Sequence, residues 1–127
     1  MFNKDKSELI TYPAGKADST YIIPDGVTII AYAFDSCKNL TRVTIPNSVT
    51  NIGNGAFEDC TSLTSINIGN SVTSIGNDAF SGCTSLKDVY YTGSQSDWKK
   101  ISIGSYNDCL TNATIHYNWS GEFPLVT

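Results

Sequence analysis

Four cysteines are the residues of this sequence best suited to chemistry, and three of them recur at one spacing. Cys37, Cys60 and Cys83 are evenly spaced along the chain, and Cys109 follows. An even number of cysteines in a short chain often indicates disulfides. Equivalent residues of stacked repeats, however, lie about 4.8 Å apart with parallel side chains, whereas bridged Cβ atoms lie about 3.8 Å apart and face each other. We therefore predict a ladder of three buried free thiols, which is also unsuited to tetrahedral zinc.

The other candidates for chemistry are few. His116 is the single histidine and falls on an outward strand position, where we expect a solvated side chain rather than a base or a ligand. Asp59, Asp78 and Asp97 fall near loops, and a weak calcium site there is kept as an open alternative. The sequence contains no phosphate-binding loop and no EF-hand loop. We therefore predict no enzymatic activity, no catalytic residues, no cofactor and no bound metal.

The elements that position these residues are copies of one repeat. The stretch VTNIGNGAFEDCTSLTSINI, residues 49–68, recurs at residues 72–91 and, one residue shorter, at residues 27–45. A fixed period in the twenties indicates a solenoid, in which each repeat is one coil stacked on the next. Phe34, Phe57 and Phe80 occupy one position of the coil, so we predict that they stack as a phenylalanine spine in the core.

Each coil shows where its strand and its turns lie. In residues 63–68 the pattern L-x-x-I-x-I points Ile66 and Ile68 inward and Ser65 and Asn67 outward. We predict a right-handed solenoid with a parallel β-sheet on one face, formed by residues 20–23, 40–45, 63–68, 86–91 and 114–117. Short 3₁₀ or extended segments are expected on the opposite face, with little helix overall.

Departures from the period mark the ends. Residues 1–19 are predicted to be an N-terminal cap made of a hairpin and a loop, and residues 20–91 the repeats. Residues 92–117 are predicted to be a C-terminal capping repeat, followed by a tail or linker at 118–127. Within that cap, SQSDWKK resembles a helix start, and Trp98, one full period after Ile75, is expected to fill the isoleucine position as a plug over the core. Cys109 is expected to be buried there.

Composition excludes several classes of function. The net charge is −4 and the charges are scattered, which argues against nucleic acid and against a polybasic membrane patch. No apolar run approaches the roughly 20 residues of a membrane span, so membrane insertion is not expected. The N-terminus lacks an apolar signal region. We expect a signal peptide to lie outside this sequence.

The repeats SVTNIGNGAFEDCTSLTSINI and SVTSIGNDAFSGCTSLKDVYY resemble the 23-residue leucine-rich repeats of BspA-like bacterial surface proteins. Residues 92–117 also resemble the closing segment common in such proteins. The resemblance covers residues 9–117 and implies an extracellular or cell-surface adhesin-type module without a catalytic motif. It also implies a protein partner, with host matrix or plasma proteins as candidates.

The outward strand positions are the predicted binding surface, because the fold does not require their identities. The hypothesis is that an otherwise non-enzymatic, monomeric module binds a protein partner through Arg42, Thr44, Ser65, Asn67, Asp88, Tyr90 and His116. Tyr90 is the expected aromatic anchor, because tyrosine is favoured at interfaces. The alternative is a structural spacer or stalk segment of a larger cell-surface protein.

Overall fold

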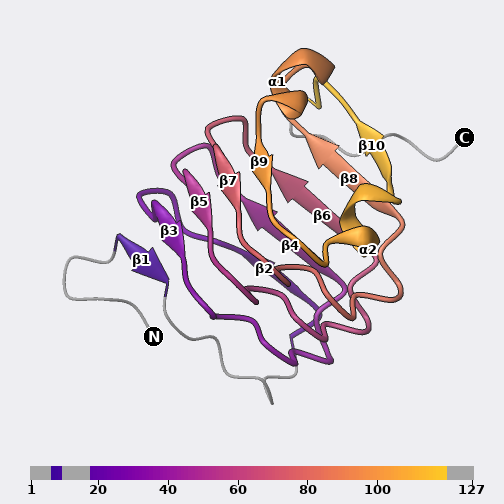
Figure 1. The fold of residues 1–127 in the computed structure, drawn as a ribbon. Helices are drawn as coiled ribbons and strands as arrows, with labels where there is room; N and C mark the ends of the chain where they lie inside the picture. The colour runs from indigo at the N-terminus through magenta and orange to yellow at the C-terminus, as the bar shows by residue number, and fades with distance from the viewer. Residues whose placement is uncertain (1–6, 10–17, 120–127) are drawn as a thin grey trace, which may run out of the picture.

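The computed structural model describes residues 7–9 and 18–119, and within them the chain winds as a solenoid with two parallel five-stranded sheets (Figure 1). The two sheets face each other across the core, and the chain alternates between them. Sheet A contains β1 (Glu8–Leu9), β3 (Ile29–Ile30), β5 (Asn51–Ile52), β7 (Ser74–Ile75) and β9 (Ser102–Ile103). Sheet B contains β2 (Thr20–Ile22), β4 (Arg42–Ile45), β6 (Ser65–Ile68), β8 (Asp88–Tyr91) and β10 (Thr114–His116).

The strands of sheet B confirm the predicted register. Val43 pairs with Ile66, Ile66 with Val89, and Val89 with Ile115, although the last step along the chain is longer than the earlier ones. The extended segments expected on the opposite face are more ordered than predicted, because they pair as the two-residue strands of sheet A. Each coil of the repeat is therefore hydrogen-bonded to its neighbours on two sides, once in sheet A and once in sheet B.

The core between the sheets is built from ladders of like residues. Phe57 lies between Phe34 and Phe80, with ring centroids 4.8 and 5.2 Å away and nearly parallel planes. All three rings are fully buried. The predicted phenylalanine spine is confirmed, and each coil contributes one slab to a continuous core.

Turns connect the two sheets at each end of a coil. In the third full coil, Ser81 N–H donates to the Asp78 carbonyl and Cys83 N–H to the Phe80 carbonyl, both at 3.2 Å. These are i to i+3 bonds in successive turns, so the segment resembles the expected 3₁₀ conformation without forming a regular helix.

The last coil differs from the prediction in one respect. Helix α1 (Gln95–Lys99) begins with a capping box, in which Ser94 and Asp97 bond each other's backbone N–H, as the sequence indicated. Trp98 is buried against Tyr91, with ring centroids 5.1 Å apart. It does not fill the isoleucine position, however, because Ile103 of β9 pairs with Ile75. The helix is an insertion that displaces the repeat register, and Trp98 packs from the helix instead.

The segment around α2 (Asp108–Thr111) covers the end of the core, and the side chain of Asn107 makes the hydrogen bonds that join it to the last coil. In earlier coils the N–H of Phe34 and of Phe57 donates to an alanine carbonyl of the next coil. Phe80 N–H donates instead to Asn107 Oδ1, at 3.0 Å. Asn107 Nδ2 donates to the carbonyls of Gly76 and Gly104, each at 3.0 Å. One side-chain amide therefore replaces the missing backbone of a further coil.

The N-terminal hairpin and loop expected within residues 1–19 fall mainly outside the described residues. The described part, Glu8–Leu9, pairs in parallel with β3, and Leu9 is buried in the core. The tail expected at residues 118–127 likewise lies outside the described part, except for Asn118 and Trp119. No helix among the described residues is long and apolar enough to cross a membrane.

Candidate functional site

The candidate site is the outward face of sheet B, which we call the strand face. It consists of two rows of side chains that run from coil to coil in register. One row contains Thr20, Arg42, Ser65, Asp88 and Thr114, and the other contains Ile22, Thr44, Asn67, Tyr90 and His116. All seven residues predicted for the site lie on this face, because strand alternation turns them away from the core.

The middle of the strand face is a polar network. Arg42 Nε donates to Ser65 Oγ at 2.9 Å, and Asn67 Nδ2 donates to Thr44 Oγ1 at 2.9 Å. Ser65 and Asn67 were expected to be open to solvent, but their exposed fractions are 5% and 1%. They point outward and are nevertheless covered, because contacts with neighbouring side chains, such as those with Arg42 and Thr44, contribute to their burial. The two outer members of the network, Arg42 and Thr44, keep part of their surface accessible.

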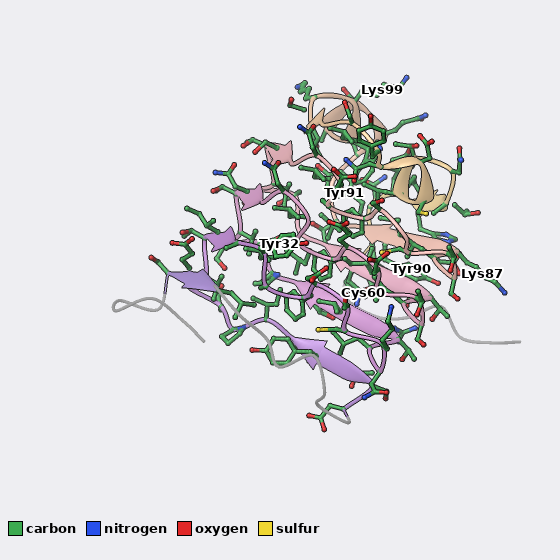
Figure 2. All side chains as sticks on the ribbon, turned by 60° about the horizontal axis from the view of Figure 1, so that its bottom comes forward. Tyr32, Cys60, Lys87, Tyr90, Tyr91 and Lys99 are labelled. Atoms are coloured by element: carbon green, nitrogen blue, oxygen red, sulfur yellow. The ribbon has the colours of Figure 1, made fainter. Side chains whose placement is uncertain are left out.

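The C-terminal part of the strand face is aromatic. The rings of Tyr90 and His116 stack with centroids 4.6 Å apart, and Trp119 lies on Tyr90 at 5.9 Å. His116 Nε2 lies 2.9 Å from Asp88 Oδ1, so the histidine is paired rather than merely solvated as predicted. Tyr90, labelled in Figure 2, is half-buried within this cluster and is not the isolated exposed aromatic that the sequence indicated. We call Tyr90, His116 and Trp119 the aromatic cluster.

The cysteine ladder is structural. All four thiols are free in the described residues, and Cys37, Cys60 and Cys83 are buried as predicted, whereas Cys109 is only half-buried. Cys60 Sγ donates to the Phe34 carbonyl at 2.9 Å and Cys83 Sγ to the Phe57 carbonyl at 3.0 Å. Burial raises the pKa of Cys60 to about 12, so the thiol stays protonated and unreactive. The thiols therefore fasten one coil to the preceding one.

The aspartates considered for calcium have backbone roles. Asp59 and Asp78 adopt left-handed conformations, each with φ of 59°, which short polar side chains tolerate. Asp97 belongs to the capping box of α1. Among the described residues, no three His, Cys, Asp or Glu side chains gather as a possible metal site.

Stacked parallel coils of this length, with leucine and isoleucine positions facing one core, define a leucine-rich repeat solenoid. A family model described as a BspA type leucine rich repeat region matches residues 16–120. The chain belongs to the BspA-type leucine-rich repeat family. The comparison with curated proteins finds no match.

Several solved structures are similar to this chain. The T. pallidum leucine rich repeat protein is 29% identical with a TM-score of 0.53, covering 91% of this chain and 66% of that one. A leucine-rich repeat protein from Eubacterium ventriosum is 27% identical, with a TM-score of 0.53, and the match covers 82% and 37% of the two chains. A leucine rich cell surface protein from Faecalibacterium prausnitzii is 31% identical, with a TM-score of 0.40 and coverage of 80% and 39%. The chain spans less than two fifths of the length of the latter two proteins.

Proposed function

We propose that this protein is a non-enzymatic recognition module of a bacterial cell-surface protein and that it binds a protein partner through the strand face. Membership of the BspA-type family supports an extracellular position. Host matrix or plasma proteins are the partners to test first. Adhesion by such a module gains from many copies on one cell, because multivalency strengthens contacts that are individually modest.

The observation that carries this proposal is the aromatic cluster beside the polar network. Tyr90 and His116 are held by stacking, and His116 is held further by Asp88. Side chains that are already ordered lose less entropy when they bind, which favours affinity. Tyrosine, tryptophan and arginine are also the residues that dominate binding energy at interfaces. Arg42, Tyr90 and Trp119 supply one of each on the same face of the solenoid.

The test is a triple variant that changes the half-buried residues and leaves the buried ones in place. Arg42→Ala, Tyr90→Ala and His116→Ala are combined, whereas Ser65 and Asn67 are kept, because changing covered residues would disturb the fold. If a hot spot contributes about 2 kcal/mol, binding to a purified matrix or plasma protein weakens by roughly 30-fold or more.

The matched control is a triple variant on the opposite face. Asn51, Ser74 and Ser102 are the outward residues of successive strands of sheet A, and their replacement by alanine removes polar groups there without touching the strand face. Binding should survive in this control. Equal binding by both variants and the parent would contradict the proposal and would favour the spacer function instead.

A further inference from the structure

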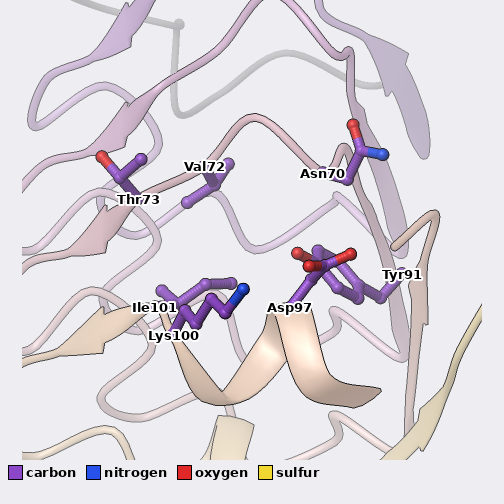
Figure 3. Close-up of a pocket in the computed structure, with 7 residues that line it drawn as sticks. All are labelled: Asn70, Val72, Thr73, Tyr91, Asp97, Lys100 and Ile101. Carbon is purple, nitrogen blue, oxygen red and sulfur yellow. The ribbon is translucent and has the colours of Figure 1, made fainter. Parts of the chain in front are cut away.

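A small pocket lies apart from the strand face, between α1 and the preceding coil. Its volume is about 180 Å³, and it is lined by Asn70, Val72, Thr73, Tyr91, Asp97, Lys100 and Ile101 (Figure 3). The volume is well below the roughly 300 Å³ at which pockets for drug-sized ligands begin. The pocket therefore suits a molecule the size of a single metabolite or amino acid.

The floor of the pocket is apolar. Val72 and Ile101 belong to the hydrophobic core, and their exposed fractions are 3% and 8%. Figure 3 shows Val72 opposite Ile101, with the pocket between them. An aliphatic side chain placed there would be removed from water on two sides, which is favourable in proportion to the apolar area buried.

The walls of the pocket carry opposite charges. Asp97 and Lys100 are three residues apart on α1 and its C-cap, so their side chains lie on the same side of the helix and both line the pocket. Within the described part of the chain, Asp97 and Lys100 form no ion pair shorter than 4.0 Å. The Lys100 side chain is exposed. One oxygen of Asp97 accepts from Ser94 N–H, which leaves the other oxygen for a further donor.

Tyr91 supplies a polar group that also has no partner. The exposed fraction of Tyr91 is 1%, yet its hydroxyl forms no hydrogen bond within the described residues. Figure 3 shows Tyr91 beside Asp97 at one end of the pocket. Among the described residues, Tyr91 Oη is not one of the buried atoms that lack a partner, so it is open to solvent and a ligand in the pocket can bond to it in place of water. An ammonium group can donate to Tyr91 Oη and Asp97 together.

From this arrangement we propose that the pocket binds a free α-amino acid with a branched aliphatic side chain. The ammonium group bonds to Asp97 and the Tyr91 hydroxyl, and the carboxylate bonds to Lys100. The side chain lies between Val72 and Ile101. Binding is reversible and involves no covalent step, and the small contact area limits the Kd to the order of 1 mM.

The experiment titrates L-leucine into the ¹⁵N-labelled protein and follows backbone amide shifts by NMR. Saturable shifts are expected at residues 70–73 and 97–101. Two probes each lack one charge: 3-methylbutylamine has no carboxylate and 4-methylpentanoate has no ammonium. Each should bind about tenfold more weakly, because a hydrogen bond to a charged group contributes about 1.5–3 kcal/mol. Equal binding of all three probes, or no shifts with leucine up to its solubility, would overturn the proposal.

Variants separate the charges from the fold. Lys100→Gln should weaken leucine about tenfold while leaving the binding of 3-methylbutylamine unchanged, and Tyr91→Phe should weaken both ligands. Asp97→Asn removes the charge and also alters the helix cap, so Ser94→Ala, which alters only the cap, is its control. Loss of binding in Ser94→Ala to the same degree as in Asp97→Asn would show that helix integrity, not the carboxylate, is responsible, and would contradict the assignment.

Discussion

Asn107 offers the sharpest test of how this solenoid is closed, and the perturbation is Asn107→Ala. The residue is the N-cap of α2, but its side chain makes no capping bond and is 3% exposed. Its side chain accepts from Phe80 N–H and donates to the carbonyls of Gly76 and Gly104, each at 3.0 Å, with a longer bond to the Ser105 carbonyl at 3.4 Å. Alanine removes the three short bonds and the longer one at once, and it leaves the spine residue Phe80 with an unpaired N–H.

The expected loss of stability follows from the three short bonds, each at 3.0 Å. A buried N–H without a partner costs about 1–3 kcal/mol, and each lost bond to a carbonyl costs about 0.5–1.5 kcal/mol. The cost at the Gly76 carbonyl is smaller than at the other acceptor, because this carbonyl also accepts from Ala79 N–H at 3.3 Å and keeps that bond in the variant. We therefore expect Asn107→Ala to lower the free energy of unfolding by about 3 kcal/mol. For a chain of this length that corresponds to a fall in Tm of roughly 10 °C.

The assay is urea unfolding followed by circular dichroism, with hydrogen exchange as a local readout. The exchange of the Phe80 amide should accelerate in Asn107→Ala more than that of the Phe57 amide, whose acceptor is the Ala79 carbonyl. Asn112→Ala is the matched control, because Asn112 is the exposed C-cap of α2 and makes its bonds through the backbone. Asn107→Asp keeps the acceptor for Phe80 but loses the donors, and it should also destabilise.

The reasoning would be refuted by one clear result. If Asn107→Ala and Asn112→Ala unfolded within about 0.5 kcal/mol of each other, the amide would not close the core, since changes at unimportant surface positions have effects of that size. Unchanged exchange at Phe80 would lead to the same conclusion. In that case the closure of the last coil would rest on Trp98 and α1 alone.

Three further predictions concern the coils themselves. Phe57→Ala should lower the free energy of unfolding by about 3–5 kcal/mol, because the cavity touches both stacked neighbours, and a Tm within a degree or two of the parent would contradict the spine. Gly76→Ala should cost about 1–3 kcal/mol, because its Cβ would lie 2.5 Å from Asn54 N of the preceding coil, and urea unfolding measures this directly. The pKa of Cys60 is raised by burial from 9.0 to about 12, so above about pH 9 the unfolded chain loses a proton that the folded chain keeps, and stability should fall with rising pH. Comparing unfolding of the parent and Cys60→Ala at about pH 7.5 and about pH 10 isolates this contribution, and an equal pH dependence in both proteins would show that Cys60 does not cause it.

The repeat period was sufficient to predict the architecture. Every coil repeats the same inward and outward pattern, so the period and the alternation in residues 63–68 predicted sheet B, its register and the stacking of Phe34, Phe57 and Phe80. These features depend only on which way each residue points, and that direction follows from the backbone conformation of a single coil. The free state of the three buried thiols followed from the same spacing.

The last coil could not be predicted in the same way, because an insertion removes the period on which the argument depends. Counting one period from Ile75 reached Trp98, whereas Ile103 occupies the position, since α1 bulges out before β9 begins. Asn107 gave no signal in the sequence. Its role exists only because Phe80 N–H reaches the end of the stack without a further coil to accept it.

The sequence alone was sufficient to place the seven residues of the candidate site on one face. Strand alternation determines which residues point outward, and no other information is needed. Their environment was decided by the tertiary structure. Ser65 and Asn67 became covered, His116 acquired Asp88 as a partner, and Trp119 joined Tyr90 from beyond the last strand. The physical reason is that direction is a local property of the backbone, whereas burial and pairing depend on side chains that are a full coil or more away in the chain and meet only when the coils stack.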